Sequence, residues 1–185
     1  MEMLVVFFII SIGLYAAVAL VMSNVTTQEY DADHIVAMNL AREMLELAQN
    51  KRDSNWLTSA AFDDGMLSLP GGCTAVPHWD GTDFPYFEPA SSISDANAKV
   101  NQSNNPASQY MLTNQSGTST RFSRLLTFAP ICAKPDHSET TVSPGCTCLA
   151  AYPDKVGMRA KADIQWVTKG RTRKLSVYTD LYDWK

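Results

Sequence analysis

The sequence predicts an α+β protein, with one long N-terminal α-helix packed on a C-terminal antiparallel β-sheet. Three observations lead to this prediction. Twenty uncharged and mostly apolar residues run from Met3 to Met22. Helix-compatible sequence then continues to Arg52 without a turn signal. Alternating apolar residues, which are typical of half-buried strands, come only near the end of the chain.

These patterns divide the chain into three parts. We expect residues 1–27 to form an apolar helix for a membrane or a filament core. Residues 28–55 should form the amphipathic half of the same helix. Residues 56–185 should form a globular head, with a variable loop over residues 80–120 and a C-terminal sheet. A chain of 185 residues has room for one such head with a modest core.

The apolar segment is about as long as a helix that crosses a ~30 Å hydrocarbon layer. Glu2 stands at its start, where a carboxylate costs free energy unless it reaches water or a cation. A cleaved secretory signal would need a basic n-region and a shorter apolar core, but no Lys or Arg precedes Arg42. A single-span anchor is a further alternative, although it lacks the basic flank that normally sets orientation.

The second half of the helix carries one apolar stripe at three- and four-residue steps. The stripe consists of Ala37, Leu40, Ala41, Met44, Leu47 and Ala48. Lys51 and Arg52 suit the last helical turn, and the segment 53–55 supplies turn chemistry. Gly13 and the segment 23–27 are poor helix formers, so we expect any bend there.

Residues 56–120 read as irregular, with turns at 69–73 and 80–85 and a long polar loop at 91–119. Residues 121–128 form a strand candidate. The best hairpin pairs an alternating strand at 160–166 with another at 175–181, through a turn at 168–171. The apolar stripe of the helix should cover one face of this sheet.

Composition and cysteines point to an exported structural domain. The net charge is −4, and the sequence gives no sign of a basic surface that would bind nucleic acid. An even number of cysteines beyond an apolar N-terminal segment predicts two disulfides in an oxidising compartment. Cys146 and Cys148 are too close for easy pairing with each other, so each should reach Cys73 or Cys132. The three histidines are scattered, which gives a zinc site little support.

The sequence offers no recognisable catalytic signature. It has no P-loop, no G-x-G-x-x-G, no G-x-S-x-G and no H-E-x-x-H motif, so we expect neither enzyme activity nor a cofactor. The segment 80–83 (Asp-Gly-Thr-Asp) could hold calcium, but an ordinary turn explains it better. Sequons at Asn101 and Asn114 match the N-glycosylation pattern. Six aromatic residues could form a binding patch, although packing is the simpler explanation: Phe84, Tyr86, Phe87, Tyr178, Tyr182 and Trp184.

Several segments together resemble the type IV pilin family. The start Glu2-Met-Leu-Val-Val6 and the apolar run to Ala19 look like the beginning of a mature pilin helix. The segments 41–46 and 52–56 look like its end, and 177–184 is similar to the terminal strand. The resemblance covers the first 56 residues well and the last 30 loosely, and the middle carries none.

The resemblance implies a filament subunit that is stored in the cytoplasmic membrane and then polymerises with other copies in an extracellular pilus. Its partners would be other copies, the pilus assembly machinery and the prepilin peptidase; no surface ligand is implied. The residues implied in assembly are Glu2, Met3, Leu4, Val5, Val6, Phe7, Phe8 and Gly13.

Two departures from the family pattern concern the helix. In pilins the glutamate is normally the fifth residue of the mature chain, whereas here it is the second. Either the numbering begins inside the mature segment or the processing site is unusual. The proline that many pilins carry near position 22 is absent, and Gly13 or the segment 23–27 could provide a break instead.

A second class of function fits the same apolar segment. A membrane-tethered extracellular binding or sensory module would need the anchor but would not polymerise. Within the pilin reading, the sequence leaves major subunit, minor subunit and pseudopilin as alternatives. Adhesion, motility and DNA uptake are equally compatible with the helix.

Overall fold

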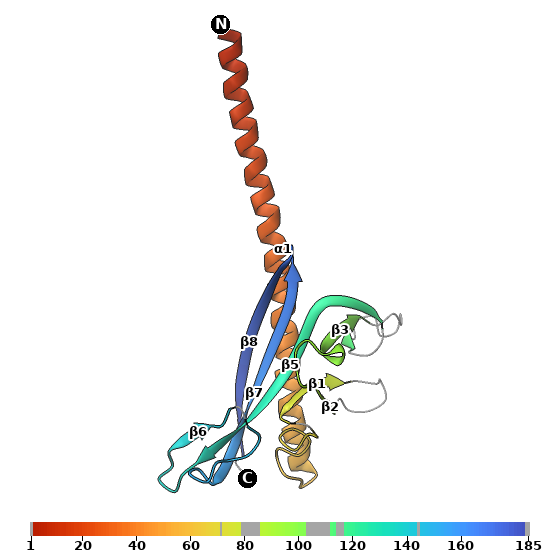
Figure 1. Cartoon of the computed structure of the whole chain (residues 1–185), viewed down its shortest axis with the longest axis vertical. Helices are drawn as coiled ribbons and strands as arrows, with labels where there is room; N and C mark the ends of the chain where they lie inside the picture. Colours follow the sequence, from red (N-terminus) through yellow and green to blue (C-terminus); the bar gives the residue numbers. More distant parts are fainter. Residues whose placement is uncertain are drawn as a thin grey trace. The chain divides into compact units, whose positions relative to one another are not determined.

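The computed structural model describes residues 2–70, 72–78, 86–102, 112–113, 117–143 and 145–183 (Figure 1). One α-helix, α1, spans Glu2–Leu57. The short helix η1 spans Ala96–Ala98. Eight strands form one sheet in these residues: β1 Thr74–His78, β2 Tyr86–Pro89, β3 Lys99–Gln102, β4 Leu112–Thr113, β5 Thr118–Ala133, β6 Glu139–Thr141, β7 Asp154–Thr168 and β8 Arg171–Tyr182. The predicted α+β class is confirmed.

The chain divides into two compact units, Met1–Val36 and Ala37–Lys185. The first unit contains only the N-terminal part of α1. The second contains the rest of α1 and the whole sheet, and we call it the head.

Strand β5 is the central strand of the sheet and pairs with four other strands. One edge of β5 pairs with β7 from Phe122 opposite Trp166 to Ala133 opposite Asp154. The other edge is shared in turn by β3, β1 and β6, which are all much shorter. β8 extends the sheet beyond β7, and all these pairings are antiparallel. A single 16-residue strand therefore organises most of the head.

The apolar stripe of α1 packs on this sheet as predicted. Ala37, Leu40, Ala41, Met44 and Ala48 are buried, whereas Leu47 is half-buried. They share one core with alternate residues of β7, which are Met158, Ala160, Ala162, Ile164 and Trp166. Because alanine occurs on both sides, the helix backbone can approach the strands closely.

One ion pair crosses this core. The Arg124 guanidinium on β5 lies 3.1 Å from the Glu43 carboxylate on α1, and Arg124 is almost fully buried. A buried arginine is costly unless a carboxylate compensates its charge. The pair therefore fixes which turn of α1 lies over the middle of β5.

The predicted hairpin between β7 and β8 is confirmed. Thr168 lies opposite Arg171, so two residues make the turn. Lys169 and Gly170 have φ values of 49° and 72°. Positive φ at both central positions is the type I′ geometry that matches the twist of a hairpin.

Helix α1 is longer than predicted at its C-terminal end. It continues to Leu57, so Lys51 and Arg52 do not lie in its last turn, and the expected turn at 53–55 is wrong. The Asn55 side-chain amide donates to the carbonyl groups of Phe62 and Asp64, at 3.1 and 2.9 Å. Asn55, which was expected to form a turn, therefore lies in the helix and stabilises the loop that follows it.

Gly13 and the segment 23–27, the places named for any bend, do not interrupt the helix, because α1 is continuous through both. The hydroxyls of Thr26 and Thr27 donate to the carbonyls of Met22 and Ser23, at 2.9 and 3.1 Å. Hydroxyl bonds of this kind let polar residues sit within a helix without exposing an unsatisfied group.

The interpretation of residues 56–120 as irregular holds for 58–70, 72–73 and 90–95 but is wrong for other described parts. Strands β1 to β4 and η1 lie there, and β5 begins at Thr118 rather than at Arg121. A second small core of Val76, Ala90, Ala98 and Leu125 holds this region against the far face of β5. Residues 80–85, 103–111 and 114–116 of the predicted variable loop lie outside the described residues.

We predict that Met44→Ala destabilises the head. Met44 is fully buried under the sheet, and such truncations cost about 2–5 kcal/mol. Met38→Ala is the matched control, because Met38 lies on the same helix with 43% of its surface exposed. Chemical unfolding of the two variants, followed by near-UV circular dichroism, measures the difference. Equal losses of stability would contradict the packing described above.

Candidate functional site

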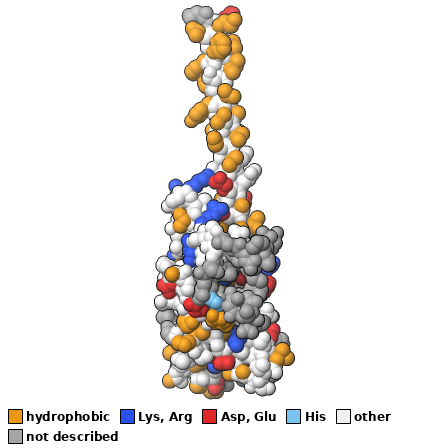
Figure 2. Space-filling model, turned by 90° about the vertical axis from the view of Figure 1, so that its right-hand side faces the viewer, with side chains coloured by type: hydrophobic (Ala, Val, Ile, Leu, Met, Phe, Trp, Pro, Cys, Tyr) orange, Lys and Arg blue, Asp and Glu red, His pale blue; other side chains and the backbone are white. Residues whose placement is uncertain are grey.

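The candidate site is the apolar segment Met3–Met22 of α1. Its large side chains are half or more exposed within the structure, for example Met3 at 75% and Phe8 at 67%. Figure 2 shows hydrophobic side chains (orange) covering this part of the helix. The segment is long and apolar enough to cross a membrane, and none of its most apolar window is buried. So large an exposed apolar surface must be covered by lipid or by protein.

The polar groups of this segment suit an apolar environment. Beyond the first turn, its backbone N–H groups are paired within the helix, which is the requirement for any segment in hydrocarbon. The Ser11 hydroxyl donates to the Phe7 carbonyl at 2.7 Å, so it needs no external partner. Gly13 has no side chain, and a Cβ added there would meet nothing within 4 Å. The helix backbone is therefore uncovered at this residue, where a neighbouring helix could approach it.

Glu2 is the only charged residue before Glu29 and lies in the first turn of α1. The helical period places Glu2 beside Val5 and Val6, while Phe7 follows Met3 and Phe8 follows Leu4 on neighbouring faces. The structure therefore arranges the predicted assembly residues 2–8 as two consecutive turns with one acid at their start. No Lys or Arg in the first unit could pair with that acid.

The four cysteines form Cys73–Cys146 and Cys132–Cys148. Their Cα atoms are 5.5 and 5.8 Å apart, which is ordinary disulfide geometry. As predicted, Cys146 and Cys148 each reach one of the two distant cysteines. Both bridges tie the connection between β6 and β7 to the sheet, so the cysteines are structural.

Other candidate sites from the sequence do not assemble in the described residues. In that part of the chain no three His, Cys, Asp or Glu side chains come together as a metal site. The calcium candidate at 80–83 and the sequon at Asn114 lie outside it. Asn101 is a strand residue of β3, paired on both sides by β4 and β5.

The aromatic residues do not form one patch. Phe87 on β2 is buried against Phe128, with ring centroids 5.3 Å apart. Tyr178 on β8 lies under the Arg159 guanidinium, 4.4 Å from its ring centroid. Phe84 and Trp184 lie outside the described residues. Packing therefore accounts for Phe87, whereas Tyr86, Tyr178 and Tyr182 are exposed.

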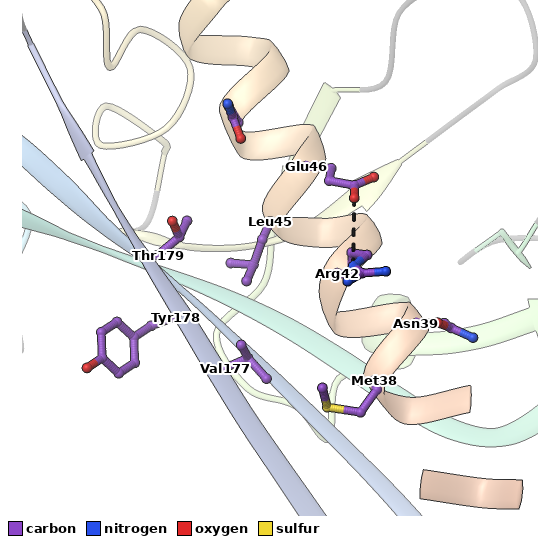
Figure 3. Close-up of a pocket in the computed structure, with 9 residues that line it drawn as sticks. Met38, Asn39, Arg42, Leu45, Glu46, Val177, Tyr178 and Thr179 are labelled. Atoms are coloured by element: carbon purple, nitrogen blue, oxygen red, sulfur yellow. Dashed lines mark ion pairs between the residues drawn. The ribbon is translucent and has the colours of Figure 1, made fainter. Parts of the chain in front are cut away.

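The sequence did not reveal a groove between α1 and β8 in the head. It has a volume of about 440 Å³ (Figure 3). Met38, Asn39, Arg42, Leu45, Glu46 and Gln49 line it from α1, and Val177, Tyr178 and Thr179 line it from β8. The residues that line the groove lie beside the apolar stripe of α1 and on the last strand. A search of the sequence for buried positions does not single out such residues.

Comparison with protein-family models, curated proteins and solved structures finds no match to this chain. The case for a function therefore depends on the apolar segment and on the head described above.

We predict that Ile9→Lys combined with Leu14→Lys removes the chain from the membrane. Each lysine near the centre of a spanning helix costs about 2.5–3.5 kcal/mol on insertion scales. The matched control is Ser23→Lys combined with Thr27→Lys, which places the same charges beyond the apolar run. Cell fractionation with alkaline extraction measures the distribution. A doubly charged variant that stays fully in the membrane fraction would show that this segment is not the anchor.

Proposed function

We propose that this chain is a structural subunit of a type IV pilus-like filament. The apolar segment of α1 holds it in the cytoplasmic membrane, and the same segment then polymerises in an extracellular filament. The observation that carries the proposal is the exposed apolar surface of Met3–Met22 on a helix that continues without a break into the folded head.

The physics of the segment favours exchange between lipid and protein surroundings. Lipid chains and neighbouring apolar helices cover such a surface about equally well, so leaving the membrane for a helical bundle forfeits little hydrophobic free energy. Helices packed head-to-tail make heterologous contacts, which propagate as an open helical polymer. The head then lies on the outside and needs no chemistry of its own.

Glu2 gives such a polymer its register. In a bundle of apolar helices an unpaired carboxylate is strongly disfavoured, and an amino-terminal ammonium of a neighbouring copy would compensate it. A subunit that enters at a wrong axial height leaves this charge buried and unpaired. The acid therefore selects one arrangement among many that have similar apolar contacts.

A membrane-tethered binding module that never polymerises is the alternative. It uses the apolar segment only as an anchor, and the groove beside β8 would be its natural contact surface. In that case Glu2 would lie at the membrane edge in contact with water.

Electron microscopy and mass spectrometry of material sheared from cells that make this protein separate the two functions. Abundant filaments composed mainly of this chain would support a major pilin. Filaments that hold it as a trace component would support a minor one. Retention of the whole population in the membrane fraction would overturn the proposal in favour of the tethered module.

We predict that Glu2→Lys blocks incorporation into filaments. Breaking a buried ion pair costs about 3–5 kcal/mol, so incorporation should fall by more than about a hundredfold. Glu2→Asp is the control, because it keeps the charge at the same turn. Quantitative mass spectrometry of sheared filaments from cells that also make the wild-type chain gives the ratio. Glu2→Lys subunits at wild-type levels would contradict the role of the acid, while intact disulfides would confirm that the head is folded.

A further inference from the structure

Strand β8 forms a long edge of the sheet. It has 12 residues, and in the part of the chain that the structure describes its partner is β7 alone. The β7–β8 register runs without a shift, so β8 is a regular strand. Proteins usually protect so long an edge with charges, bulges or a covering element, because its free backbone groups can pair with another chain.

The charged residues of this edge lie at its two ends and are absent from its centre. Arg171, Arg173 and Lys174 stand before residues 175–179, and Asp180 and Asp183 stand after them. Residues 175–179 (Leu-Ser-Val-Tyr-Thr) carry no charge. The groove opens along this uncharged stretch, since three consecutive residues from Val177 to Thr179 line it. The edge is therefore protected at its ends and accessible at its centre.

We propose that β8 pairs with β8 of a second copy of this chain, antiparallel and centred on Val177. Charge complementarity identifies the occupant. In this register Lys174 lies opposite Asp180 of the second copy, and Arg171 lies opposite Asp183. Two-fold symmetry repeats both pairs, so four opposite-charge contacts flank the uncharged centre. Asp180 also binds Arg159 of its own chain, so Lys174 of the second copy would join an existing ion pair, and Arg171 with Asp183 makes the independent contact. Opposite charges directly across an antiparallel pair stabilise it by about 0.2–1 kcal/mol each.

The faces of the two strands also match. Leu175 and Val177 lie on the α1 side of β8, where they pack against the core. Pairing that is centred on one residue keeps odd-numbered positions on the same face in both copies. The Leu175 and Val177 side chains of the second copy would therefore enter the groove beside Met38 and Leu45 (Figure 3).

The helices leave room for this pairing. Helix α1 shares its core with β7, where Ala160 and Ala162 are fully buried, and with β5 through Glu43 and Arg124. Neighbouring strands lie about 4.8 Å apart, so the two copies of β7 would be about 14 Å apart. A helix with its side chains is about 10 Å wide, so the two helices fit next to each other with the groove between them.

The pairing has a defined direction. Because its two-fold axis is normal to the sheet, the two copies of β8, and with them the packed halves of α1, run in opposite directions. Subunits of one filament all point the same way, so the contact cannot form within a filament. In the filament proposed above, it would join two filaments that run antiparallel, and repetition along their length would add avidity.

Cross-linking of the full chain in detergent micelles tests the pairing independently of filament formation. Opposite Cα atoms in an antiparallel pair are about 4.5–5.5 Å apart, which is within disulfide range. No described cysteine is free, so Val177→Cys supplies the trapping thiol. Under mild oxidation we expect about tenfold more disulfide dimer than for Val167→Cys, the equivalent of roughly 1.4 kcal/mol. Val167 is an exposed residue of β7 and serves as the matched control.

The register is tested in the Val177→Cys background. Arg171→Asp places two acids opposite each other at both ends and should reduce the dimer about tenfold. The combination of Arg171→Asp with Asp183→Arg restores the opposite charges and should restore the dimer. Equal trapping of Val177→Cys and Val167→Cys, or trapping that ignores the charge at 171, would overturn the proposal. If Val177→Cys does not fold, sedimentation of the wild-type and Arg171→Asp chains decides, and a monomeric wild-type chain overturns the proposal.

Discussion

The close contact between α1 and the sheet is the constraint on which the rest of the head depends. Alanine at 37, 41 and 48 on the helix meets alanine at 160 and 162 on β7, and none of these side chains is exposed. Met44 and Trp166 lie in the same buried core as these small residues. The Glu43–Arg124 pair then fixes the helix along its axis. A larger residue at any of these fully buried alanine positions would overpack the core, which typically costs about 1–3 kcal/mol.

A second constraint is that one helix must suit two surroundings. Its first half presents apolar side chains on all sides, which is typical of helices in lipid or in a bundle. Its second half buries one apolar stripe in the core and exposes mostly polar residues elsewhere, together with Ile35, Val36 and Met38. Thr26 and Thr27 lie between the two halves, and their hydroxyls donate to carbonyls of the same helix, which is continuous through them. Continuity matters for the proposed function, because the segment that polymerises is covalently part of the helix that holds the head.

Much of this fold could be predicted because its periodic parts are strong. The apolar run, the stripe from Ala37 to Ala48 and the β7–β8 hairpin each repeat a pattern over many residues, and each is present. The cysteine spacing limited the disulfides to two arrangements. The shorter elements could not be predicted, because β1 and β3 owe their existence to the long edge of β5 rather than to any alternation of their own. The groove could not be predicted from the sequence either, because it depends on which side of α1 the sheet leaves uncovered.

The spacing of the last two cysteines affects the order in which the head can form. Cys146 and Cys148 are separated by one residue, so exchanging their partners would move that segment by only about 7 Å in an extended chain. Proximity along the chain therefore does not distinguish the native bridges from the swapped ones. The distinction must come from Cys73 and Cys132, which are already fixed at the start of β1 and near the end of β5 once the sheet has formed. The sheet thus positions the two partner cysteines, and oxidation before the strands have paired would give a mixture of native and swapped bridges.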